Sequence, residues 1–245
     1  MKATIERATL LRCLSHVQSV VERRNAIPIL SNVLIEAEGS NSLKVMATDL
    51  DLQVVEHMAA KVESEGAITV SAHLLFDIAR KLPDGSEVSL ETAENRMEVK
   101  ASRSRFKLPT LPRDDFPVIV EGDLPTSFEV PARTLAELID RTRFAISTEE
   151  TRYYLNGIFL HASEDDRPVL KAAATDGHRL ARYTIDQPDG AEGMPDVIVP
   201  RKAVAELRKL LEESLDGSVL VDLSASKIRF TLGGEGGVVL TSKLI

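Results

Sequence analysis

The sequence predicts an α+β protein of two tandem domains, each with two helices packed on antiparallel β-sheets. Its 245 residues suit two domains of about 120 residues better than one. A succession of amphipathic helix and short strands occurs twice, with Thr48 and Thr175 standing 127 residues apart in matching segments. Turn dipeptides such as Asp84-Gly85 and Asp216-Gly217 separate the strand-like segments, as in antiparallel hairpins.

The first repeat opens with a helix expected over 7–24. Its apolar stripe consists of Leu10, Leu14, Val17 and Val21. A strand-rich segment follows over 27–38, and the alternation of strands, a short helix over 72–81 and further strands continues to residue 111.

The second repeat contains the same succession of elements. A helix is expected over 132–143, with an apolar stripe of Leu135, Leu138, Ile139, Thr142 and Ile146. Segment 151–163 (TRYYLNGIFLHAS) is predicted as strand. Another helix is expected over 201–213. Matching pairs are Asn32 with Asn156, Thr48 with Thr175 and Asp49 with Asp176.

The boundary is expected near residue 125, where Pro112, Pro117, Gly122 and Pro125 interrupt a stretch without periodicity. The predicted domains are therefore 1–125 and 126–245. Because the second repeat stops where the first continues, we expect a third, C-terminal domain of the same kind that is absent from this sequence.

Charge is distributed unevenly along the chain. The net charge is −8, yet the four predicted helices hold 13 Lys or Arg against 7 Asp or Glu, so they carry +6 and the remainder −14. On the first helix, Arg12, His16, Ser19 and Arg23 recur opposite the apolar stripe. Helices often expose basic residues, but this segregation favours a surface that attracts phosphates without reading bases.

Composition also limits the class of protein. Charges at Glu6, Arg7 and Arg12 interrupt the stretch that a signal peptide needs, and the chain has no apolar run long enough for a membrane helix, so we expect a cytoplasmic protein without membrane association. Cys13 is the sole cysteine, which excludes an internal disulfide.

Catalytic patterns are weak. The five histidines have no metal-ligand spacing, and neither a GxSxG motif nor a P-loop occurs. Asp176 and His178 are close enough for acid-base chemistry, but no nucleophile accompanies them and the first repeat lacks the histidine, which favours a structural turn. We therefore predict no catalytic residue, metal or cofactor.

The strings IPILSN, SRFKLPTLP, TRYYLNG, ATDGHRLA, VIVPRK and TSKL, in this order, resemble the bacterial DNA polymerase III beta subunit family of sliding clamps. The resemblance extends over the whole chain. It implies a DNA clamp fold of three similar domains per subunit, a homodimeric ring in the full-length protein, and helices around double-stranded DNA. The implied protein partners are the polymerase III alpha subunit, the clamp loader, and other polymerases and repair proteins with clamp-binding peptides.

The resemblance also implies three sets of site residues. The DNA-binding positions would be Arg24, His73, Glu149, Tyr153 and Tyr154. Of these, His73 and Glu149 depart from the family's residues, and one of the adjacent tyrosines could instead face the core. The peptide-binding cleft would consist of Arg152, Leu155, Thr175, Gly177, His178, Arg179 and Leu180. The dimer interface would contain Arg96, Lys100, Arg103, Arg105, Phe106 and Leu108, unless these form a solvated basic edge strand.

Two other functions remain open from the sequence. A hydrolase using Asp176 and His178 would lose turnover on His178→Ala. A protein-interaction scaffold that never touches DNA would keep polymerase processivity after neutralisation of Arg24 and the helix arginines.

Overall fold

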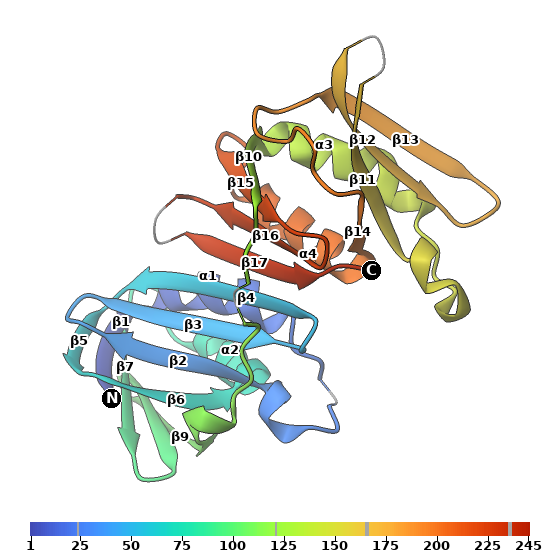
Figure 1. Ribbon diagram of the computed structural model, residues 1–245. Coiled ribbons are helices and arrows are strands. Elements are labelled where there is room, and N and C mark those ends of the chain that lie inside the picture. Colours follow the sequence, from blue (N-terminus) through green and yellow to red (C-terminus); the bar gives the residue numbers. More distant parts are fainter. Residues whose placement is uncertain (24, 121, 165–166, 235–236) are drawn as a thin grey trace. The chain divides into compact units, whose positions relative to one another are not determined.

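The computed structural model describes residues 1–23, 25–120, 122–164, 167–234 and 237–245 (Figure 1). They form two compact units, Met1–Ile119 and Val120–Ile245. Each unit combines two α-helices with antiparallel strands, so the predicted α+β class is confirmed.

In the first unit, one continuous series of antiparallel strands has the order β4-β3-β2-β6-β9-β8-β7-β1-β5. Within this series, β6 and β9 pair only through Thr69 with Leu111 and Val70 with Thr110. The elements are β1 (Lys2–Glu6), α1 (Arg7–Gln18), η1 (Pro28–Ser31), β2 (Asn32–Glu38), β3 (Ser42–Thr48), β4 (Leu52–Ala59), β5 (Lys61–Ser64), β6 (Gly66–Ser71), α2 (Ala72–Lys81), β7 (Glu87–Ala93), β8 (Arg96–Ala101), β9 (Ser104–Leu111) and η2 (Arg113–Asp115).

In the second unit, the strands form two separate ladders, β10-β15-β16-β17 and β13-β12-β11-β14. The amide of Ile245 donates to the carbonyl of Ile198 over 3.1 Å and so links the end of one ladder to the other. The elements are β10 (Thr126–Pro131), α3 (Ala132–Thr142), η3 (Arg143–Ala145), η4 (Glu150–Leu155), β11 (Gly157–Glu164), β12 (Pro168–Thr175), β13 (Leu180–Asp186), β14 (Val197–Pro200), α4 (Arg201–Glu212), β15 (Ser218–Leu223), β16 (Lys227–Leu232) and β17 (Val238–Lys243).

The two units repeat one element order: strand, helix, 3₁₀ segment, strands, helix and a three-stranded meander. The predicted apolar stripes are buried in both, from Leu10 to Val21 and from Leu135 to Ile146. In the second unit, α3, α4 and both ladders share one core, in which Leu138, Leu207 and Phe230 are almost completely buried. Alternate burial along β16 follows the period of two that a half-buried strand requires.

The first helix is shorter than predicted. It ends at Gln18 instead of residue 24, and the chain continues through turns in which the amides of Val20 and Val21 donate to carbonyls three residues back. These β-branched residues have low helix propensity, and both are buried, so core contacts rather than helical continuation fix their backbone.

The prediction of strand throughout 151–163 is wrong for its first half. Residues Glu150–Leu155 form the 3₁₀ segment η4, and β11 begins only at Gly157. The backbone there bonds to neighbouring segments instead of to a sheet: the carbonyl of Leu155 accepts from the amide of Ser147, and that of Asn156 from Arg201. η1 occupies the same place in the first unit.

Candidate functional site

The turn between β12 and β13, from Thr175 to Leu180, is a densely hydrogen-bonded polar group of the second unit. The Asp176 carboxylate accepts the amides of His178 and Arg179, each over 3.0 Å, and the Arg179 Nε over 2.9 Å. The Thr175 hydroxyl accepts the Gly177 amide and donates to the Arg179 carbonyl. These donors lower the pKa of Asp176 to about 2, with the two backbone amides as the main cause.

The first unit contains the same turn between β3 and β4. The Asp49 carboxylate accepts the amides of Asp51 and Leu52, while the Thr48 hydroxyl accepts the Leu50 amide and donates to the Leu52 carbonyl. Leu50 has φ +84°, the counterpart of Gly177 at +90°. A leucine thus occupies a left-handed position that glycine fills in the second unit.

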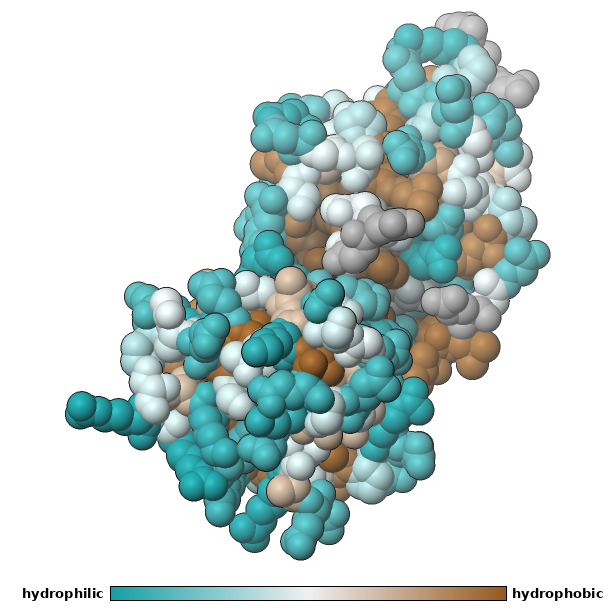
Figure 2. Space-filling view, turned by 90° about the vertical axis from the view of Figure 1, so that its left-hand side faces the viewer, coloured by the Kyte–Doolittle hydropathy of each residue, from teal (hydrophilic) through white to brown (hydrophobic). Residues whose placement is uncertain are grey.

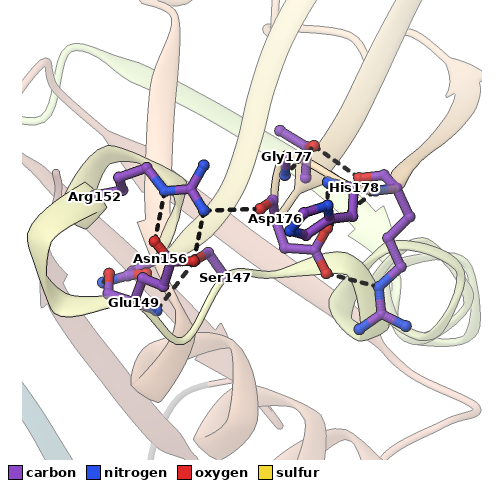
Figure 3. Close-up of polar contacts among 9 residues, drawn as sticks. Ser147, Glu149, Arg152, Asn156, Asp176, Gly177 and His178 are labelled. Atoms are coloured by element: carbon purple, nitrogen blue, oxygen red, sulfur yellow. Dashed lines mark hydrogen bonds and ion pairs between the residues drawn. The ribbon is translucent and has the colours of Figure 1, made fainter.

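Arg152 of η4 lies against the second-unit turn (Figure 3). Its Nε and Nη2 donate to the two carboxylate oxygens of Glu149 over 2.8 and 2.6 Å, and Nη2 also donates to the Asp176 carbonyl over 3.2 Å. The Arg152 guanidinium lowers the pKa of Glu149, mainly through these hydrogen bonds. η4 and the turn are therefore joined through one guanidinium.

The segment carrying Arg152 is anchored from both sides. The Ser147 hydroxyl accepts the Glu149 amide, and the Asn156 side-chain amide donates to the Glu149 carbonyl (Figure 3). The Oδ1 of Asn156 is buried and has no hydrogen-bond partner among the described residues. Ser147 and Asn156 were not predicted as site residues, although the match of Asn156 with Asn32 in the other repeat was a signal for Asn156.

Exposed apolar side chains surround this polar group. Tyr153 and Tyr154 are 65% and 52% exposed and meet edge to face, with ring centroids 5.8 Å apart. The alternative that one of them faces the core is therefore wrong, because neither belongs to a strand. Leu180 is 70% exposed, and Arg179 lies over the exposed Phe144 ring. Figure 2 looks onto the other side of the second unit, where apolar residues also reach the surface between polar ones.

The remaining cleft positions fall on the same elements. Leu155 is half-buried at the end of η4, while Gly177, His178 and Arg179 are exposed on the turn. The seven predicted cleft residues thus lie on two segments, η4 and the turn between β12 and β13, which Arg152 joins. The Glu149–Arg152 pair was not predicted, although acidic and basic residues three positions apart were a visible signal.

Of the predicted DNA-binding positions in the first unit, Arg24 lies outside the described residues. His73 is half-buried on α2, and its Nε2 lies 2.9 Å from the Val21 carbonyl. Its Nδ1 is buried without a hydrogen-bond partner in the described part of the chain.

The basic helix faces are partly neutralised by neighbouring carboxylates. In the second unit, Arg208 Nε lies 3.0 Å from both carboxylate oxygens of Asp140, which also pairs with Arg143. Further pairs are Arg133 with Asp216, Arg141 with Glu137, Lys209 with Glu206, Arg80 with Asp77 and Arg12 with Glu56. His16 lies opposite the apolar stripe but is not part of an open basic face: its side chain is 11% exposed, with Nδ1 2.8 Å from the buried Glu56 carboxylate.

The predicted interface residues lie on β8, β9 and their connection. Leu108 is buried, Phe106 is 37% exposed, and Arg96, Arg103 and Arg105 are exposed. β9 pairs with β8 over residues 104–109 but with β6 only at 110–111, so among the described residues of this unit one edge of 104–109 is unpaired. Glu98 binds Arg105 and Lys100, which lower its pKa to about 2.

Among the described residues, no group of three or more His, Cys, Asp or Glu side chains is arranged to hold a metal ion. In the same part of the chain, no helix is long and apolar enough to cross a membrane. Asp176, the candidate acid-base residue, uses its carboxylate to bind its own turn.

Comparison with known proteins gives consistent matches. The family model of the DNA polymerase III beta subunit N-terminal domain matches residues 1–120, and that of its central domain matches 129–245. The chain is 52% identical over 248 residues to the beta sliding clamp of Caulobacter vibrioides (strain NA1000) and 38% identical to that of Escherichia coli K12. In both cases the alignment covers 100% of this chain and 65% of the relative's length.

Solved structures agree. The DnaN sliding clamp of Bartonella birtlesii bound to griselimycin has a TM-score of 0.96 at 52% identity, over 100% of this chain and 65% of that one. The polymerase III beta of Caulobacter crescentus has a TM-score of 0.95 at 51% identity, over 100% of this chain and 66% of that one.

Proposed function

The chain belongs to the DNA polymerase III beta subunit family, and from that premise we propose that it forms the first two domains of a sliding clamp. The clamp encircles double-stranded DNA without sequence specificity and acts as the processivity factor of the bacterial replicative polymerase. The first domain corresponds to residues 1–125 and the central domain to 126–245, in a cytoplasmic homodimer completed by a third domain. It works as an accessory subunit, without catalysis or cofactor.

The observation that carries this proposal is the agreement of the whole chain, across both repeated units, with sliding clamps at a TM-score of 0.96. A ring that encloses DNA needs repeated domains and helices with excess positive charge, and this chain has both features. Contacts to phosphates supply attraction without sequence readout, which permits movement along the duplex.

DNA contact is assigned to Arg24, His73, Tyr153 and Tyr154, with an indirect role for Glu149. The exposed tyrosine pair supports this assignment, because aromatic rings and hydroxyls at a surface can pack on sugar and bond to phosphate. Glu149 repels phosphate but holds a neighbouring arginine. Since many helix arginines are already paired, the contact with DNA is loose.

The cleft residues Arg152, Leu155, Thr175, Gly177, His178, Arg179 and Leu180 bind short peptides with an apolar anchor. An exposed Leu180 beside a polar turn supports this, since peptide sites combine an apolar pocket with a few polar groups. Partners are the polymerase III alpha subunit, the clamp loader, and other polymerases and repair proteins.

The unpaired edge of β9 is the dimer contact, with Arg96, Arg103, Arg105, Phe106 and Leu108. An edge strand with free backbone groups pairs readily with a strand of another chain. Its basic side chains favour an acidic partner surface on the second subunit.

Neutralising Arg201 and Arg208 to Gln, in a protein of the relatives' full length that carries these residues, tests the function. Polymerase processivity should fall clearly at low salt, and the difference from wild type should shrink as the salt concentration rises. Unchanged processivity would favour the scaffold hypothesis. Substrate turnover that disappears on His178→Ala would favour a hydrolase, whereas a clamp loses only peptide affinity.

A further inference from the structure

Arg152 has most of its hydrogen-bonding capacity already in use. Its Nε–Nη2 edge forms a bidentate pair with Glu149, and Nη2 also binds the Asp176 carbonyl. The remaining nitrogen, Nη1, lies over Gly177, where a Cβ would stand only 2.8 Å away. The guanidinium is thus held by a carboxylate of its own chain and pressed onto the turn (Figure 3).

The first unit provides an internal comparison. Pro28 precedes Asn32 by the same four residues that separate Arg152 from Asn156, so no guanidinium is available at that place. There, Leu50 occupies the left-handed turn position that Gly177 holds in the second unit. A side chain is accommodated where the arginine is missing, and glycine is present where the arginine lies on the turn.

We propose that Glu149 is a specificity-determining residue of the cleft, which withdraws the Nε–Nη2 edge of Arg152 from incoming carboxylates. The cleft then prefers peptides whose residue beside the apolar anchor is uncharged over peptides with an acidic residue there. This inference rests on the peptide cleft of the proposed function.

The physical basis is competition for one donor edge. An arginine binds a carboxylate best through two parallel N–H groups, and in this chain Glu149 occupies that pair of donors. A ligand carboxylate would have to displace Glu149 or approach a guanidinium whose charge is already compensated. The Asp176 carboxylate, in the turn that Arg152 contacts, adds further negative charge nearby. An uncharged amide or hydroxyl meets no such penalty.

Two substitutions separate this role from general charge. Glu149→Gln removes the charge that binds Arg152, whereas Glu150→Gln removes the same charge one residue away. Glu150 is exposed and forms no ion pair among the described residues, which makes it a matched control.

Affinity for two labelled decapeptides, identical except for Asp or Asn beside a Leu-Phe anchor, is measured by fluorescence anisotropy with the full chain. Wild type should favour the Asn peptide. Glu149→Gln should raise the relative affinity for the Asp peptide about three- to fivefold, the size expected of one charge in a partly exposed site. Glu150→Gln should leave the ratio near the wild-type value, and high salt should shrink the gain.

Hydrogen exchange without ligand gives a second readout. Glu149→Gln should accelerate amide exchange in both 150–156 and 175–180, because Arg152 is released from the turn, while Glu150→Gln should do neither. Equal effects of the two variants in both measurements would overturn the inference. If wild type bound neither peptide, the proposed function would fail, and the exchange data alone would decide whether Glu149 holds Arg152 on the turn.

Discussion

Gly177 lies directly beneath the guanidinium of Arg152, so closely that a Cβ at position 177 would be 2.8 Å from Nη1. Its φ of +90° imposes a second restriction, because L-residues rarely adopt that conformation. Gly193 has φ +66° and no atom within 4 Å of the corresponding Cβ, so it shares the conformation without the contact.

Gly177→Ala should therefore destabilise the second unit more than Gly193→Ala. We expect each to cost about 1 kcal/mol for the left-handed conformation, with about 0.5–1 kcal/mol more at position 177 as the Arg152 pair is displaced. The free energy of unfolding of both variants is measured by chemical denaturation. In an Arg152→Ala background the excess should vanish, and an excess that persisted would show that Arg152 is not its cause.

Asp176 should make the stability of the second unit depend on pH in the acid range. Its folded pKa of about 2 lies below the ordinary 3.8, so its contribution is complete above about pH 4 and is lost as the pH falls towards 2. Asp176→Asn should lower the free energy of unfolding at pH 6 and converge with wild type near pH 2. Asp189→Asn, at an exposed position without a described hydrogen bond, should show no such convergence.

Asp140 restrains two arginines on the helix face, Arg208 and Arg143. Asp140→Asn should cost about 1 kcal/mol of stability, since the pair is only partly buried, yet strengthen DNA binding about two- to fivefold at low salt, as one more cation becomes available to phosphate. Asp186→Asn removes an equally charged, ion-paired residue from β13 and is the control. Equal effects of both on DNA affinity would exclude a helix-specific contact.

Cys13 is completely buried on α1, and burial raises its thiol pKa well above the ordinary value, with the Glu56 carboxylate adding to the effect. Folded protein should therefore not react with a thiol reagent at pH 8, and labelling should appear only as denaturant opens the first unit. Because Cys13 is the sole cysteine, the labelling rate reports this unit alone. Rapid labelling of the folded chain would contradict its buried position.

The sequence was informative where one physical signal dominates. The apolar stripes from Leu10 and Leu135 located the cores, and the shared Thr-Asp pairs at 48–49 and 175–176 located equivalent turns. It failed where tertiary bonds override local preference. η4 has strand-like composition, but the carbonyl of Leu155 accepts the Ser147 amide and that of the following Asn156 accepts the Arg201 amide. The position of His16 depended on a buried carboxylate 40 residues away, which helical periodicity cannot reveal.

The proposed enclosure of DNA is tested most directly by retention on circular and linear templates. A protein of the relatives' full length that carries these 245 residues is loaded onto nicked circular DNA, and bound protein is followed before and after the circle is cut once. We predict stable retention on the circle and rapid release from the open ends after cutting. Equal retention on both forms would contradict topological linkage and with it the account of this chain as part of a sliding clamp.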